Sequence, residues 1–111
     1  MKIALPVPPS TNELFRNVPG RGRVITGKYQ RWIEDAKSRF WGVKYSMFDV
    51  PVFIVIVLAD GRGPDCDNSL KAPIDLLKKM GVIKDDRRKY VRGVSARLGD
   101  VKECEVEVIA A

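Results

Sequence analysis

The segment VPVFIVIVLA, residues 50–59, decides the fold of this chain. Nearly every position is apolar and many are β-branched, which is typical of a strand covered on both faces. The run is about half as long as a membrane-spanning helix requires. We therefore expect residues 50–58 to form the central strand of a sheet. It would be covered on both faces, or shielded by helices on one side and by a dimer partner on the other.

Two helices are predicted, one on each side of this strand along the chain. Thr26 is a suitable N-cap for a helix from about Gly27 to Trp41. A second helix is predicted from about Asn68 to Met80, and Gly81 suits its end. Pro73 is tolerated only in a first turn, which favours a start one or two residues later. The predicted buried stripes are Tyr29, Trp32, Ile33, Ala36, Phe40 and Val43 in the first helix, and Leu70, Ile74 and Leu77 in the second.

The remaining segments complete the predicted fold. Residues 1–7 suggest a short edge strand that ends at a proline-rich stretch, and residues 17–27 suggest a mobile basic loop. Residues 89–98 predict a strand with a bulge at Gly93. Residues 103–109 alternate strictly, which points Cys104 inward and the glutamates outward. The prediction is a single α+β domain over residues 1–111, with a small mixed β-sheet and two α-helices packed on it.

Composition limits the possible functions. The net charge is +6, and the segment 14–48 alone has eight cations and two acids (8 − 2 = +6). A local positive field suggests a polyanionic partner such as nucleic acid, although a solvated helix face explains the same charge. Histidine is absent, which excludes imidazole bases and histidine-bound zinc. The two cysteines match no zinc spacing. No leader or membrane segment is recognisable, so we expect a cytoplasmic protein.

The sequence GPDCDNSLKAPID, residues 63–75, has the densest group of chemically active side chains. It follows the predicted central strand, where clefts commonly form. Alternation points Asp65 and Asp67 to the same side. After the second helix, a reversal at Gly81 returns Asp85 or Asp86 toward that pair. Like charges about 4 Å apart repel by roughly 4 kcal/mol at an intermediate dielectric, so converging carboxylates require a cation, and Mg²⁺ prefers such hard oxygen ligands.

Each of these residues also has a purely structural interpretation. Lys71 either neutralises a phosphate in the transition state or pairs with Asp67 or Asp75 at i,i+4. Asn68 either supports a metal loop or caps the helix. Aspartate and asparagine also cluster in ordinary turns, so D-x-D-N alone is a weak signal.

Taken together, four stretches resemble the RusA family of phage-associated Holliday junction endonucleases. They are LPVPPSTNELFR, the basic segment after it, DCDNSLKAPID and MGVIKDD, and they span nearly the whole chain. The resemblance implies a homodimer that uses Mg²⁺, with Mn²⁺ able to substitute, to make paired symmetric nicks in four-way junction DNA during recombination and repair. It also implies that Asp65, Asp67 and Asp86 are metal ligands and that Lys71 is catalytic. Asn68 and Asp85 take supporting roles.

The chain departs from the family in one place. The segment before the acidic pair is often strongly basic in the family, whereas DGRGP has only Arg62. Two alternative functions remain open: a non-catalytic basic DNA-binding accessory protein, and a metal nuclease acting on other branched DNA or on RNA. The predicted DNA-binding residues are Arg16, Arg21, Arg23, Lys28, Arg62, Arg87 and Arg88.

Overall fold

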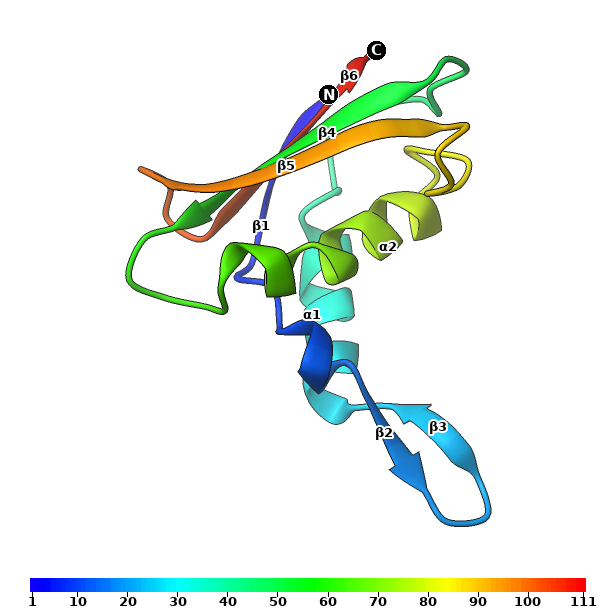
Figure 1. The fold of residues 1–111 in the computed structure, drawn as a ribbon. Coiled ribbons are helices and arrows are strands. Elements are labelled where there is room, and N and C mark those ends of the chain that lie inside the picture. Colours follow the sequence, from blue (N-terminus) through cyan, green and yellow to red (C-terminus); the bar gives the residue numbers. More distant parts are fainter.

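The computed structural model describes residues 1–111 and is built on a four-stranded sheet (Figure 1). The strands are β1 (Lys2–Leu5), β4 (Val52–Ala59), β5 (Val91–Gly99) and β6 (Cys104–Ala110). Their order across the sheet is β1-β6-β4-β5, with β4 parallel to β5 and antiparallel to β6. The sheet is therefore mixed, and β4 is an interior strand with β1 at one edge, as the sequence predicts.

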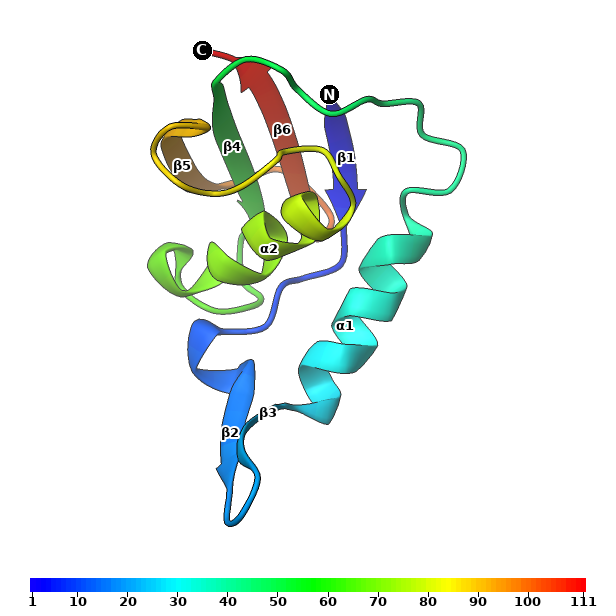
Figure 2. The ribbon, with the colours of Figure 1, turned by 90° about the vertical axis from the view of Figure 1, so that its right-hand side faces the viewer.

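Both helices, α1 (Gly27–Ser38) and α2 (Lys71–Lys79), pack on the same face of this sheet (Figures 1 and 2). The predicted N-cap is confirmed, because the Thr26 hydroxyl accepts a hydrogen bond from the Tyr29 backbone N–H at 3.2 Å. The first helix ends three residues before the predicted Trp41, whose side chain is 92% exposed. Neither helix is both long and apolar enough to cross a membrane.

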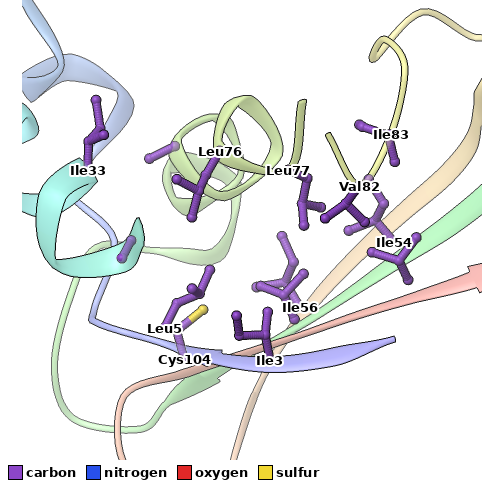
Figure 3. Close-up of a cluster of buried hydrophobic side chains, with 14 of the residues drawn as sticks. Ile3, Leu5, Ile33, Ile54, Ile56, Leu76, Leu77, Val82, Ile83 and Cys104 are labelled. Carbon is purple, nitrogen blue, oxygen red and sulfur yellow. The ribbon is translucent and has the colours of Figure 1, made fainter. Parts of the chain in front are cut away.

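A continuous apolar core lies between the sheet and the helices (Figure 3). The inward residues of β4 and β6 meet Leu76 and Leu77 of α2, and Cys104 is buried among them. Burial raises the pKa of the Cys104 thiol to about 12, so the group stays protonated and acts as a small apolar side chain. The alternation predicted for residues 103–109 is therefore confirmed.

The opposite face of the sheet has no helix on it. Phe53 and Ile109 are adjacent on that face and are 43% and 42% exposed. Helices thus cover only one side of the central strand, so the first of the two predicted arrangements, a strand covered on both faces, is wrong for the single chain.

Residues 17–27 form structure where the sequence predicts a mobile loop. The strands β2 (Phe15–Val18) and β3 (Gly22–Ile25) pair as an antiparallel hairpin that projects from the helical side (Figure 1). Gly20 and Gly22 have φ near +78° and +74°, a conformation that favours glycine at the turn. The expected loop is therefore an ordered basic arm.

The second helix also differs from its prediction. A short 3₁₀ helix, η2 (Cys66–Ser69), precedes α2, which places Pro73 within the first turn of α2. The start at Lys71 is consistent with the steric restriction that proline imposes. Leu70 and Ile74 are only partly buried, because the face that meets the sheet consists of Ala72, Pro73, Leu76 and Leu77.

The bulge predicted in β5 is confirmed. The register between β4 and β5 shifts between Val52 and Phe53, which are opposite Val91 and Gly93. A Cβ at Gly93 would lie 3.1 Å from the Phe53 ring, so the missing side chain leaves room for this aromatic group.

Candidate functional site

The acidic loop begins directly after β4 and its shape is set by backbone contacts. Asp65 stands at the N-cap of η2, and its carbonyl oxygen accepts a hydrogen bond from the Asn68 N–H at 3.0 Å. The Ser69 hydroxyl is fully buried and lies 2.9 Å from the same carbonyl. Thr11 donates to the Asn68 carbonyl at 3.3 Å, which ties this loop to the preceding segment η1 (Thr11–Glu13). The loop therefore holds its form without using its carboxylates.

The side chains of Asp65 and Asp67 are exposed and unpaired. The Asp65 side chain makes no capping hydrogen bond, and neither carboxylate forms an ion pair with a lysine or arginine. Two free carboxylates one residue apart are hard oxygen donors that suit Mg²⁺. The Asp65 carboxylate therefore does not cap η2, and no lysine or arginine neutralises either carboxylate.

The exposed side of α2 holds lysines that pair with other acids. Lys71 Nζ lies 3.2 Å from Asp75 Oδ2, one of the two i,i+4 partners predicted for it. In the last turn of α2, Lys78 Nζ lies 3.6 Å from Asp85 Oδ1 and 3.7 Å from Asp86 Oδ1. All three of these carboxylate–lysine contacts are solvent-accessible and therefore weak.

The chain reverses after α2 and brings its second acidic pair back over the helix. Gly81 has φ near +74°, which ends the helix, and the Val82 N–H bonds back to the Leu77 carbonyl at 2.9 Å. Asp85 then accepts from the Asp86 backbone N–H at 2.8 Å, and its other oxygen pairs with Arg87. The Asp86 N–H is the main cause that lowers the pKa of Asp85, with Arg87 contributing.

A groove of about 540 Å³ runs between α2 and the β2–β3 hairpin. One wall is apolar and comes from the hairpin and α1, while the other is charged and comes from α2 and the loop after it. Burial, with the Asp75 charge adding to it, raises the pKa of Tyr29 to about 12, so this hydroxyl stays protonated. The lining residues are Phe15, Ile25, Tyr29, Ile33, Lys71, Asp75, Lys78, Lys79 and Asp86.

The structure brings Lys71 and Asp86 into this groove but leaves Asp65 and Asp67 outside it. No three acidic side chains gather closely enough to hold a metal ion. The physical reason is repulsion between like charges, since carboxylates without a cation between them separate or pair with lysines. Asp85 and Asp86 do the latter through Lys78.

Most of the predicted DNA-binding residues are exposed cations. Arg16, Arg21 and Arg23 extend from the hairpin, and the Arg23 guanidinium stacks 4.0 Å from the Phe15 ring centre. Lys28 is engaged differently, because its ammonium pairs with Glu13 at 2.8 Å. Arg87 pairs with Asp85, as described above. Arg62 and Arg88 are exposed and form no ion pair.

Sequence reasoning missed three features of this groove. Lys78 was not recognised as the partner of Asp86, and Asp75 was considered only as a partner of Lys71. The i,i+4 spacing of Lys71 and Asp75 and the i,i+3 spacing of Asp75 and Lys78 place these three residues on one helix face, but no such spacing predicts the contact with Asp86. The apolar wall formed by Phe15 and Ile25 had no such signal, because it depends on the unexpected hairpin.

Comparisons with known proteins identify three relatives of this chain. The chain is 31% identical over 118 aligned positions to the crossover junction endodeoxyribonuclease rusA of Enterobacteria phage HK97, covering 97% of both proteins. It is 36% identical to the Aquifex aeolicus RusA enzyme of the same description, over 74% of this chain and 66% of that one. It is 38% identical to the enzyme of Enterobacteria phage 82, over 76% and 72%. No protein-family model matches the chain.

The fold is a small α+β fold in which free carboxylates precede a lysine-rich helix. Together with relatives of this description, these features define an endodeoxyribonuclease of the crossover-junction class. The chain belongs to the RusA family, with one relative aligned over nearly its full length.

Proposed function

We propose that this protein is a Mg²⁺-dependent endonuclease that resolves Holliday junctions by paired symmetric nicks, and that Mn²⁺ can replace Mg²⁺. The observation that carries the proposal is the similarity, over 97% of the chain, to a relative named crossover junction endodeoxyribonuclease. The two unpaired carboxylates of Asp65 and Asp67, which follow a central strand and precede a helix with Lys71 in its first turn, support a hydrolytic site.

In the proposed site, a few side chains have separate roles. Asp65, Asp67 and Asp86 would hold the metal ion, with Asn68 and Asp85 in support. When bound, the ion lowers the pKa of a coordinated water and stabilises the charge that builds on the phosphate. Lys71 leaves Asp75, which lies 3.2 Å away, and neutralises the phosphate in the transition state. To hold the ion, Asp86 would have to give up its contact with the Lys78 ammonium.

The basic surface supports a DNA substrate. Arg16, Arg21 and Arg23 lie on the hairpin at one side of the groove, and Arg87 and Arg88 follow Asp86 at the other. Exposed arginines at these places suit contacts to phosphates, which fix the position of DNA without reading bases. The junction has two equivalent strands to cut, so the proposed acting form is a homodimer with matching twofold symmetry.

The direct test is incubation of a synthetic four-way junction with the protein and Mg²⁺, Mn²⁺ or EDTA, followed by a denaturing gel. The proposal predicts matched nicks in opposing arms with either metal and none with EDTA. A linear duplex and a structured RNA of equal length serve as substrate controls. Binding that is equal with EDTA and Mg²⁺, with no nick under any divalent ion, would show a DNA-binding accessory protein instead. Preferred cleavage of RNA would also contradict the proposal.

A further inference from the structure

A second cleft, of about 330 Å³, lies beside the acidic loop and shares no residue with the groove between α2 and the hairpin. Gly63 and Pro64 line it, and they directly precede Asp65. Consecutive Cα atoms lie about 3.8 Å apart and consecutive base pairs about 3.4 Å apart, so the cleft is within reach of the nucleotides next to a phosphate held at Asp65. The apolar part of the lining is Val7, Pro8, Pro9 and Trp32.

The apolar part of this second cleft is held in place by local contacts. Trp32 is buried, and its indole N–H donates to the Pro6 carbonyl at 3.1 Å, so the ring offers the cleft apolar surface only. Gly63 has φ near +89°, and a Cβ there would lie 2.7 Å from a Val7 methyl group. Only glycine lets the acidic loop pass this close to the residues after β1. The cleft and the acidic loop are therefore held together.

The charged residues of the second cleft are Glu13 and Lys28, and hydrogen bonds to the backbone hold Glu13 near the acidic loop. Glu13 lies in η1, which is beside η2 in Figure 2, and Thr11 of η1 donates to the Asn68 carbonyl of η2 at 3.3 Å. The Thr26 hydroxyl, at the N-cap of α1, donates to the Glu13 carbonyl at 2.6 Å. Neither contact uses the Glu13 carboxylate, which is left for other partners.

Glu13 and Lys28 form an exposed ion pair. Lys28 Nζ lies 2.8 Å from Glu13 Oε2, and the two side chains are 56% and 48% exposed. The hydrogen bond from Lys28 is the main cause that lowers the pKa of Glu13, so the carboxylate is ionised and only accepts hydrogen bonds. A pair this exposed contributes little to stability and exchanges readily with a ligand. The cleft therefore presents an acceptor next to a donor, beside apolar surface.

A carboxylate at this place does not suit phosphate binding, because it repels phosphates. In protein–DNA complexes glutamate instead accepts a hydrogen bond from the exocyclic amino group of a base. In the major groove, cytosine and adenine present such an amino group, whereas guanine and thymine present acceptors but no amino group. An acceptor for a lysine lies next to each amino group, N7 in adenine and O6 of the guanine that pairs with cytosine. The Glu13–Lys28 pair therefore complements the edge of an amino-bearing base.

We propose that Glu13 and Lys28 read one base beside the phosphate that is cut, and that this base is cytosine or adenine. Glu13 accepts a hydrogen bond from the exocyclic amino group, Lys28 donates to the acceptor next to it, and the edge of the base contacts the apolar lining of the second cleft. Thymine or guanine at this position sets base acceptors against the Glu13 carboxylate, which disfavours both. The inference rests on the proposed function, to which it adds a base preference.

A library of four-way junctions with randomised bases around the branch point tests the preference. The junctions are cleaved with Mg²⁺ and the nicked ends are sequenced. At one position near the cut, wild type should favour cytosine or adenine over thymine and guanine by about fivefold or more. Glu13→Gln should reduce this ratio to below about twofold, because its amide also donates to thymine and guanine. Glu34→Gln, which neutralises an exposed acid of α1 outside the cleft, is the matched control and should keep the wild-type ratio.

Removal of the amino group tests the contact itself without turnover. At each core position in turn, cytosine is replaced by 2-pyrimidinone or adenine by purine, and junction binding is measured in EDTA by fluorescence anisotropy. At one position the change should weaken binding by wild type and Glu34→Gln about fivefold and leave Glu13→Gln unaffected. An equal loss in Glu13→Gln, or a cleavage preference that Glu13→Gln leaves unchanged, would overturn the proposal. A base preference in binding without any nick refutes only the nuclease, and nicks without any base preference refute only the base reading.

Discussion

Replacing Lys78 with glutamine should strengthen metal binding. The Lys78 ammonium lies 3.7 Å from Asp86 Oδ1 and 3.6 Å from Asp85 Oδ1, so a metal held by Asp86 must displace it. Two unit charges at this separation attract by about 1 kcal/mol in water. Both side chains are 42% exposed, which reduces the contact to about 0.2–1 kcal/mol. The Lys78→Gln change should therefore lower the half-saturating metal concentration by about 1.4- to fivefold.

The assay is Mn²⁺ binding, followed by the loss of the free-ion electron paramagnetic resonance signal, so that the result does not depend on turnover. Lys79→Gln is the matched control, because Lys79 lines the same groove but forms no ion pair. The difference between the two variants should shrink at high ionic strength. If Lys78→Gln binds Mn²⁺ no better than Lys79→Gln at low salt, Asp86 is not a ligand that competes with Lys78.

Three further outcomes are expected. The folded-state pKa of Asp85 is lowered, so the ionised carboxylate stabilises the fold above the ordinary carboxyl pKa. Asp85→Asn should therefore unfold at a lower urea concentration than wild type at pH 7. This difference in urea midpoint should disappear as the pH falls below about 4. Cys66 is half-buried, while Cys104 is buried and has a pKa of about 12. A thiol reagent at pH 8 should therefore modify only Cys66 in the native protein and both cysteines in urea. Fast reaction of both cysteines in the native protein would contradict the burial of Cys104. The double variant Arg21→Ala, Arg23→Ala should weaken junction binding. The slope of log binding constant against log salt concentration should become less steep by about 2, and an unchanged slope would exclude phosphate contacts by both arginines.

Local rules predict the elements whose signals are contained within their own residues. The apolar run of β4, the Thr26 cap of α1 and the strict alternation of β6 each follow from side-chain periodicity or capping within one element. The sequence does not predict the β2–β3 hairpin, because its strands are short, contain glycine and arginine, and show no clear two-residue period of apolar side chains. The hairpin is also held by a contact outside its own strands, because the Thr26 hydroxyl donates a hydrogen bond to the Glu13 carbonyl at 2.6 Å.

The distinction between contacts within one element and contacts between elements also applies to the site. The i,i+4 contact of Lys71 and Asp75 follows from helix geometry alone, and the sequence predicts it as one alternative. Where Asp86 lies relative to Asp65 and Asp67 depends on the reversal at Gly81, on the Lys78 contacts and on the charge of any bound cation. The sequence predicts the reversal at Gly81 but not the Lys78 contacts, so the gathering of three carboxylates remains a prediction about the metal-bound protein.

The measurement that tests the central claim most directly is junction cleavage by Asp67→Asn at saturating Mg²⁺. The account predicts loss of nicked product by at least about a hundredfold, with junction binding in EDTA unchanged or tighter, because one metal-binding charge is removed and the basic surface is kept. Asp60→Asn, which neutralises an exposed acid just after β4, is the matched control and should cleave normally. Full cleavage by Asp67→Asn would contradict the assignment of this carboxylate to the site.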